Sequence, residues 1–416
     1  MMRNNAFIRR LSQRRFVATT THQPAPSLYM WGTDHNGSLC KPKDRQDEKV
    51  LDIPTRVDNW EEHLQVDTTT SANIILFSEM MIHQVVCGPT DTAIVLHNGT
   101  CLVAGENKFG QLGVGHSRPV PKFTALSLPP VQSISLGVHT AGVITMEGDL
   151  YTAGMGSSLS SGTGFLGQGE GDSCTTFQRV DSLVEDGCYV QQVQMSEYHT
   201  TVLTTEGEVL SCGAGSYGRL GNLETNDQLY LEPVELLTQG IVAIAGGKGF
   251  TLALMEDGVL YAWGRNHKGQ LGLGFGLAVD MYAMQSVPEP IQADELLGRR
   301  VVKMAAGHSH AACVTESGEL FYWGMSLYLE PVRMDSLLHT RIVDVACGQD
   351  YTLAVDEDGK LYSFGQGQTL TSKRGVLGLG SVGRADQAVW VEALDGKKVT
   401  QVSAGWSHAA CLVEDV

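Results

Sequence analysis

The sequence predicts an all-β protein, a seven-bladed β-propeller whose first and last strands lie in one blade. Three observations predict this fold. A strand–turn–strand pattern occurs seven times, and glycine is abundant, at 48 of 416 residues against 13 prolines. The last copy of the pattern also stops half-way, while a matching second half stands near the beginning of the chain.

The repeated unit is clearest in "GGKGFTLALMEDGVLYAWG", which begins at Gly246. It contains a Gly-x-x-His/aromatic loop, an apolar strand, an acidic turn with glycine, and a strand of the form LYxWG. Apolar residues alternate with period two and the turn is short, so each unit is antiparallel and cannot bury its faces alone. We take as equivalent the positions Gly88, Leu136, Ser196, Gly247, Gly307, Gly348 and Gly405.

The two ends of the chain complement each other. The seventh copy reaches "CLVEDV" at Val416 and stops inside its turn, whereas "SLYMWGTDHNGSL", Ser27 to Leu39, has no hairpin before it. Pairing these ends completes one blade and closes the ring, which removes the exposed sheet edges that an open array would leave. One propeller domain is therefore expected over residues 27–416.

These repeats resemble those of the regulator of chromosome condensation (RCC1) superfamily. The resemblance covers Ser27 to Val416 and is best preserved from Gly247 to Gly274, whereas the fifth copy, "YWGMSLYLEP", lacks the "GQLG" segment. It implies a protein partner held on one propeller face, and for some members exchange of guanine nucleotide on a GTPase. By this resemblance the partner-binding candidates are Asp91, His139, His199, His310, Asp350, Trp406 and His408.

Two interpretations of these positions stay open. His139, His199, His310 and His408 are read as one repeat position, filled by Asp91, Phe250 and Tyr351 in the other copies. The side chains there either tie each blade to its neighbour by hydrogen bonds, or stand beside loops that line the binding face. The insertion from Gly154 to Gly169 is, by its place, the nearest analogue of the β-wedge of family exchange factors, although it is rich in serine and glycine.

The glycine-rich motifs are expected to be architectural. "GQLGLG" at Gly269 occurs again in similar form at Gly110, Gly218 and Gly375, as turns that need positive φ or close backbone approach do. "GAGSYG" from Gly213 spells a dinucleotide fingerprint but lies among strands rather than at the start of a helix. We expect no cofactor and no metal, because the nine cysteines are scattered and lack ligand spacing, and no catalytic residues, so the chain is not predicted to be an enzyme.

The charge distribution bears on location and partners. The net charge is −17, and no basic run offsets it after residue 15, so direct binding of nucleic acid is not expected. Residues 1–26 hold five arginines and no acid, which is typical of a mitochondrial transit peptide. The alternative is a basic tail of a nuclear protein. No run is long enough to span a membrane.

We therefore expect a mitochondrial, monomeric RCC1-like propeller that binds a protein. The partner classes are a small or dynamin-type GTPase, for which the chain is an exchange factor, and ribosome-assembly factors, for which it is a scaffold. The alternative is a nuclear or cytosolic Ran-type exchange factor that binds chromatin. The charged segment at about 41–71 lacks the repeat and is expected to be a loop.

Overall fold

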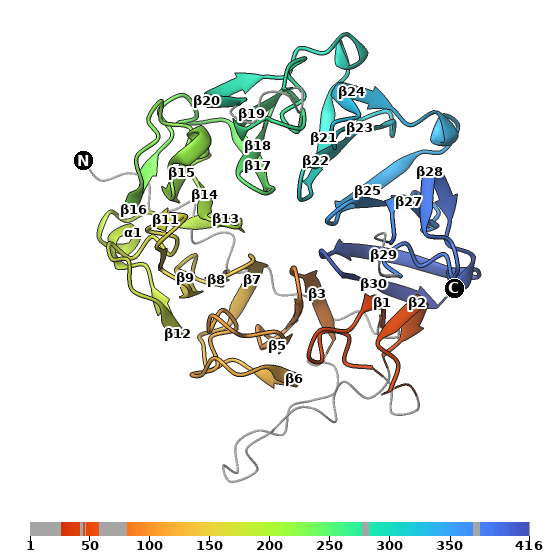
Figure 1. The fold of residues 1–416 in the computed structure, drawn as a ribbon, viewed down its shortest axis with the longest axis horizontal. Coiled ribbons are helices and arrows are strands. Elements are labelled where there is room, and N and C mark those ends of the chain that lie inside the picture. Colours follow the sequence, from red (N-terminus) through yellow and green to blue (C-terminus); the bar gives the residue numbers. More distant parts are fainter. Residues whose placement is uncertain are drawn as a thin grey trace, which may run out of the picture.

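The computed structural model describes residues 26–41, 45, 47–57, 81–276, 283–368 and 375–415. These residues form seven four-stranded antiparallel sheets set around a central axis (Figure 1). The predicted seven-bladed β-propeller is therefore confirmed. A short hairpin, β10 (Ser157–Ser158) with β11 (Gly162–Thr163), stands apart from the blades.

The blades are numbered here in chain order, and their strands run from the axis outward. Blade 1 contains β3 (Ile82–Cys87), β4 (Asp91–Leu96), β5 (Cys101–Gly105) and β6 (Val120–Ala125), and blade 2 contains β7 (Val131–Leu136), β8 (Thr140–Thr145), β9 (Leu150–Gly154) and β12 (Cys174–Arg179). Blade 3 contains β13 (Val190–Met195), β14 (His199–Thr204), β15 (Val209–Gly213) and β16 (Gln228–Pro233), and blade 4 contains β17 (Ile241–Gly246), β18 (Phe250–Met255), β19 (Leu260–Arg265) and β20 (Met284–Pro290). Blade 5 contains β21 (Val301–Ala306), β22 (His310–Thr315), β23 (Leu320–Gly324) and β24 (Tyr328–Arg333), and blade 6 contains β25 (Ile342–Cys347), β26 (Tyr351–Asp356), β27 (Leu361–Gln366) and β28 (Arg384–Trp390).

Helical structure in the described residues is limited to short segments. They are α1 (Asp181–Glu185) and the 3-10 turns η5 (Ser216–Gly218), η6 (Asp294–Leu296), η7 (Asp335–Leu337) and η8 (Glu392–Leu394). Within the described part of the chain, no helix has the length and apolar character needed to cross a bilayer.

Blade 7 is built from both ends of the chain, as predicted. β29 (Lys397–Ala404) and β30 (His408–Asp415) come from the carboxyl end, and β1 (Ser27–Thr33) pairs with β30 so that Ser27 lies opposite Val413 and Gly32 opposite His408. Trp31 of β1 is fully buried. The amino-terminal strand thus supplies the third strand that the last repeat lacks.

Part of the predicted loop at about 41–71 is instead a strand. β2 (Val50–Arg56) pairs with β1 and is the outer strand of blade 7, with Leu51 fully buried. The loop prediction was wrong there because this outer strand buries only Leu51 and Pro54, so its sequence carries no alternating apolar pattern. Residues 58–71 and, except for Pro26, the predicted leader at 1–26 lie outside the described residues.

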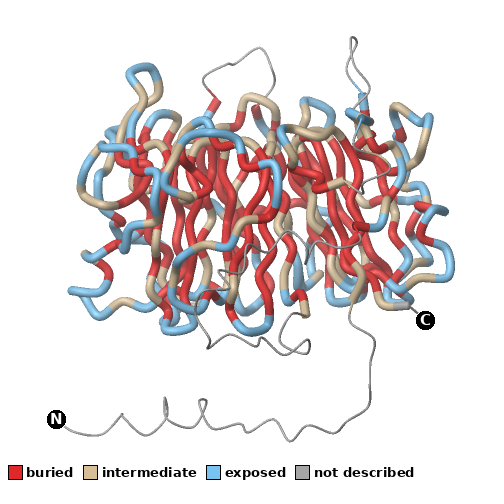
Figure 2. The backbone as a smooth tube through the Cα atoms, turned by 90° about the horizontal axis from the view of Figure 1, so that it is seen from below, coloured by how far each residue is buried: buried red, intermediate tan, exposed pale blue. Residues whose placement is uncertain are grey.

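The core lies between the blades. The second strands β4, β8, β14, β22 and β26 are buried along their whole length, because adjacent blades cover both of their faces. Figure 2 shows buried residues along the strands, which run between two rims where most of the exposed residues lie. The acidic turns predicted between second and third strands are present, and Gly258 there has a φ of 92°.

The GQLG-type loops join consecutive blades. Gly269 and Gly272 have φ values of 71° and 72°, and the loop between them lies against blade 5, where Trp323 Nε1 donates to the Gln270 carbonyl at 3.0 Å. In the same way Trp263 donates to the Arg219 carbonyl and Trp31 to the Val376 carbonyl. These glycines are architectural, as predicted, and the three tryptophans serve blade packing.

Candidate functional site

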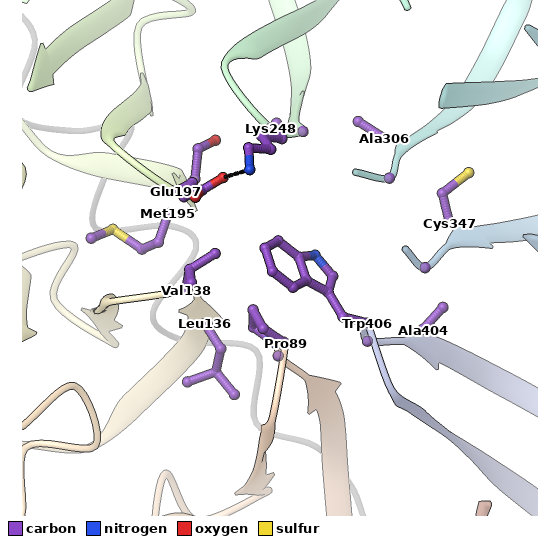
Figure 3. A pocket seen from close by; sticks show the side chains of 18 of the residues that line it. Pro89, Leu136, Val138, Met195, Glu197, Lys248, Ala306, Cys347, Ala404 and Trp406 are labelled. Carbon is purple, nitrogen blue, oxygen red and sulfur yellow. Dashed lines mark ion pairs between the residues drawn. The ribbon is translucent and has the colours of Figure 1, made fainter. Parts of the chain in front are cut away.

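The candidate site lies at one end of the propeller, which we call the loop face. It carries the seven short loops that connect each inner strand to the second strand, together with the GQLG-type loops. Because the strands are antiparallel, the acidic turns lie at the other end, the opposite face. The inner loops surround the mouth of the axial channel, a cavity of about 120 Å³ to which Pro89, Val138, Glu197, Lys248 and Trp406 contribute (Figure 3).

Three of the predicted histidines are buried between blades. His199, His310 and His408 are 1%, 4% and 0% exposed. Their Nε2 atoms lie 3.0, 3.1 and 2.8 Å from the hydroxyls of threonines on the next blade, which are Thr251, Thr352 and Thr92. The blade-tying interpretation therefore holds for these three, and their side chains are not available to a partner.

Asp91 occupies the corresponding position in blade 1 and is also buried. Its Oδ2 accepts a hydrogen bond from Gln111 Nε2 at 3.4 Å, and its Oδ1 has no hydrogen-bond partner among the described residues. Burial raises the pKa of this carboxyl group to about 7. Like the three histidines, Asp91 lies in a blade interface, where its side chain is not accessible to a partner.

His139 lies one position away from where the sequence comparison placed it. In each loop between the inner and second strands, the N–H of the first residue donates to the carbonyl of the fourth. In blade 5 this bond joins Gly307 to His310, and in blade 2 it joins Gly137 to Thr140. Gly137, not Leu136, is therefore the repeat glycine, and His139 corresponds to Asp350 rather than to His310. A one-residue shift of this kind is invisible in the sequence because "GVHT" offers a plausible histidine in either register.

The remaining predicted residues, His139, Asp350 and Trp406, are half-buried on the loop face. His139 packs edge-on against Phe109, with ring centroids 4.4 Å apart, and lies 5.8 Å from the ring of Tyr198. The Trp406 and His308 rings are 5.2 Å apart across the channel mouth. The predicted partner-binding face is thus reduced to these three of its seven residues.

An ion pair stands at the channel mouth. Lys248 Nζ lies 3.0 Å from Glu197 Oε2, between the inner loops of blades 4 and 3, and Figure 3 shows Trp406 projecting toward them. The Glu197 side chain is 8% exposed and that of Lys248 is 32% exposed. A partner at this mouth therefore meets the ammonium group more readily than the carboxylate.

Two arginines enlarge the positive charge beside Lys248. Arg219 is 5% exposed, and its Nε and Nη1 have no hydrogen-bond partner among the described residues. Its guanidinium lies 5.6 Å from the ring of Tyr198, while that of Arg265 lies 4.7 Å from the ring of Tyr217. We call Arg219, Arg265 and Lys248 the basic cluster.

Burial and the neighbouring positive charges lower the pKa values of His267 and Arg219. Burial is the largest cause that lowers the pKa of His267 to about 4, and Arg265 is the next. Burial likewise lowers the pKa of Arg219, followed by the charge of Arg265. This cluster could not be predicted from the sequence, since its members are basic residues from three separate segments of an acidic chain.

A hairpin projects from blade 2 within the predicted wedge insertion. β10 pairs with β11, and Leu159 at the turn between them is fully exposed. Asp227 of blade 3 anchors the base of this hairpin, accepting from the backbone N–H groups of Thr163 and Gly215 at 3.0 Å each. Leu159 is thus an exposed apolar side chain on a hairpin whose base is fixed to blade 3.

The described residues hold no cluster of metal ligands, and their thiols are mostly buried. No group of three or more histidine, cysteine or acidic side chains there is arranged to hold a metal ion. All nine cysteines are free, and eight of them are buried. Burial raises the pKa of the Cys101 thiol to about 12, so it is not a nucleophile near neutral pH.

Family models settle the relationship of the chain. A model described as "RCC1-like domain" matches residues 16–330, and two RCC1 repeat models match residues 342–368 and 358–412. The chain belongs to the RCC1-like domain family. The resemblance inferred from the repeats is thereby confirmed.

Two relatives of this RCC1-like protein are similar to it in sequence over about half of the chain. The secretion-regulating guanine nucleotide exchange factor of Bos taurus is 32% identical over 225 residues, which is 53% of this chain and 47% of the relative. The mitochondrial RCC1 domain-containing protein RUG3 of Arabidopsis thaliana is 32% identical over 54% of this chain and 51% of the relative. The matched part spans about half the length of these relatives.

Solved structures agree on the fold of the RCC1-like chain. Prp20p of Saccharomyces cerevisiae, whose structure title mentions binding to Gsp1p and histones, has a TM-score of 0.77 at 18% identity and covers 94% of this chain and 92% of its own. Human WBSCR16 has a TM-score of 0.73 at 20% identity and covers 94% and 100%. At these identities the likeness establishes the propeller fold.

Proposed function

We propose that this RCC1-like propeller is a mitochondrial protein-interaction module that acts as a guanine-nucleotide exchange factor for an organellar GTPase. The observation that carries the proposal is the anchored hairpin β10–β11 beside the loop face. Leu159 at its turn is fully exposed, and its base is fixed to blade 3 through Asp227. The exchange-factor relative and the mitochondrial relative support the two parts of the proposal.

Exchange of this kind needs binding energy rather than covalent chemistry. A protein that binds the nucleotide-free GTPase more tightly than the loaded form shifts the equilibrium toward nucleotide release. In our proposal the hairpin contacts the GTPase beside the channel mouth, while Lys248 and Arg265, the more accessible members of the basic cluster, bind carboxylates on its surface. Guanidinium groups bind carboxylates through two parallel hydrogen bonds, so an acidic patch on the partner is expected.

Affinity capture from mitochondrial extract tests the exchange function. The chain is expected to retain a GTPase in EDTA, which strips Mg²⁺ and nucleotide, and to release it on addition of GTP and Mg²⁺. Retention of ribosomal proteins without any GTPase would instead indicate the scaffold of ribosome assembly. Retention that nucleotide does not alter would contradict exchange.

Replacement of Leu159 tests the hairpin. Leu159→Asp is expected to reduce GTPase capture in EDTA by about tenfold or more, because the contact would have to bury an unpaired carboxylate. The matched control is Leu297→Asp, because Leu297 is also strongly exposed, at 80%, and follows η6 on the opposite face. Equal capture by the two variants would remove the hairpin from the binding surface.

The mitochondrial location is tested with residues 1–26 alone. Fused to a fluorescent protein, this segment is expected to direct import, because arginine-rich, acid-free leaders respond to the membrane potential. A fusion that accumulates in the nucleus would favour the alternative, a Ran-type exchange factor that binds chromatin. The acidic charge of the chain opposes direct contact with DNA in that alternative.

A further inference from the structure

The junction between blades 5 and 6 differs from the other six. At those six junctions a loop from one blade lies on the next and buries a leucine, at most 1% exposed: Leu39, Leu112, Leu166, Leu220, Leu271 and Leu377. Blade 5 passes from β23 to β24 through only Met325, Ser326 and Leu327. Within the described part of the chain, blade 5 therefore lacks the leucine-bearing loop that covers the next blade at the other junctions.

The pattern of loop contacts identifies the uncovered place on blade 6. At five junctions a loop N–H donates to a carbonyl of the outer strand of the next blade, for example Gly274 to Leu329 at 3.0 Å and Gly380 to Asp52 at 2.9 Å. Each acceptor is the outer-strand residue just after the one that pairs with a glycine near the end of the third strand. In blade 5, for example, Gly324 pairs with Tyr328, and the acceptor is Leu329. In blade 6 that glycine is Gly365, its partner is Ala385, and the corresponding acceptor is Asp386.

A pocket of about 590 Å³ occupies this place. Its blade 5 side includes Tyr322, Trp323 and Tyr328, and its blade 6 side includes Phe364 and Asp386. Phe364 stands where blades 4, 5 and 7 have the tryptophan that donates to the loop. Phenylalanine has no N–H group, so blade 6, unlike blades 4, 5 and 7, does not need a loop carbonyl at this position to accept a hydrogen bond.

Thr352 of blade 6 indicates that a molecule bound in the pocket would supply a carbonyl group as hydrogen-bond acceptor. The equivalent Thr92 and Thr200 each donate to a loop carbonyl of the preceding blade at 2.7 Å, Ser38 and Phe165 respectively. Thr352 lines the pocket, and its Oγ1 contacts His310 Nε2 at 3.1 Å and Cys347 Sγ at 3.8 Å. A carbonyl entering the pocket would complete the arrangement seen at Thr92.

We propose that this pocket binds a leucine-bearing loop of a protein partner, of the Gly-x-Leu-Gly type that the chain supplies to itself at the other junctions. The pocket is continuous with the loop face, because Asp350 also lines it. The partner's leucine packs against the aromatic side chains, and its backbone meets Thr352 and the outer strand. This inference deepens the proposed function by naming a second contact for the same partner.

The test uses a peptide from the chain itself, so it does not depend on the GTPase. Asn-His-Lys-Gly-Gln-Leu-Gly-Leu-Gly, the sequence of residues 266–274, carries photoactivatable leucine at the position of Leu271. It is expected to cross-link to pocket residues of the full chain, mapped by mass spectrometry. A peptide with aspartate in place of the other leucine, Leu273, serves as a composition control and is expected to label the same residues.

Two variants of the chain sharpen this test. Replacing Met325–Leu327 by the nine-residue loop fills the pocket in cis and should reduce labelling about tenfold or more. Tyr328→Asp, at a residue 37% exposed, should do the same without unfolding the chain, whereas Leu223→Asp, at a residue 73% exposed on blade 3, should leave labelling unchanged. Circular dichroism verifies that each variant is folded.

Labelling outside the pocket, or equal labelling of wild type and the loop-restored variant, would overturn the inference. Loss of GTPase capture with intact peptide labelling would count against the proposed exchange function alone. Intact capture with no peptide labelling would count against the pocket alone.

Discussion

At the scale of single residues, histidines at one repeat position connect three of the blades to their neighbours. His199, His310 and His408 each reach across to a threonine of the next blade from a fully buried site. Burial lowers their pKa values to about 3, 4 and 3 respectively. Each is therefore neutral in the folded protein at physiological pH.

These pKa values predict acid sensitivity. The unfolded chain takes up protons on these histidines below pH 6.5 and the folded chain does not, so their stabilising effect is complete above pH 6.5. It falls as pH drops toward 4, by up to about 1.4 kcal/mol per pH unit for each histidine. Urea titrations across this range measure the slope. His408→Gln should make it shallower than in the wild type, and an unchanged slope would contradict the role assigned to His408.

The site could be predicted from sequence only in part, for reasons visible at this scale. The repeat located the loops that carry His139, Asp350 and Trp406, but it could not separate buried from exposed positions within them. The alignment of the blade 2 repeat was wrong by one residue, because the histidine of "GVHT" stands one position before the position that histidine fills in blades 3, 5 and 7. The basic cluster was missed because Arg219, Arg265 and Lys248 come from two loops and the end of β19, which meet only in the folded chain.

At the scale of elements, the GQLG-type loops hold neighbouring blades together. Gly272 has a φ of 72°, and a Cβ at this position would lie 2.8 Å from Trp323 Nε1. Gly298, after η6, has a similar φ of 74° with nothing within 4 Å of its Cβ position. The two glycines separate the cost of backbone strain from the cost of lost packing.

Gly272→Ala is therefore expected to lower the free energy of unfolding more than Gly298→Ala. Both variants incur about 1–2 kcal/mol for an alanine in the left-handed region. Gly272→Ala additionally displaces Trp323 from its loop, which typically costs another 1–3 kcal/mol. Denaturant unfolding of both variants measures the difference, and equal losses would show that the loop does not pack tightly on blade 5.

The elements themselves were predictable where the motif is strong. The second and third strands of each blade followed from the alternating residues and the acidic turns, as in "TLALMEDGVLYAW". The outer strands were harder, and β2 was taken for a loop, because Val50–Arg56 buries few residues and carries no repeat motif. The hairpin β10–β11 lies in the predicted insertion, but its pairing is too short to leave a pattern.

At the scale of the whole molecule, the closing blade determines where every other feature lies. β1 reaches β30 across nearly the full chain, and His408 of the same blade is bonded to Thr92 of blade 1. This closure brings Trp406 into the channel mouth beside Glu197 and Lys248 (Figure 3). The loop face proposed to bind the partner therefore depends on the two ends of the chain remaining paired.

Hydrogen exchange of the intact chain, followed by mass spectrometry, tests this closure most directly. The amides of β1, Ser27–Thr33, are expected to exchange as slowly as those of β30, because both lie in the interior of one sheet. Residues 224–227, in the loop before β16, supply the fast-exchanging reference. Rapid exchange of β1 together with slow exchange of β4 and β14 would contradict a ring closed by its own ends.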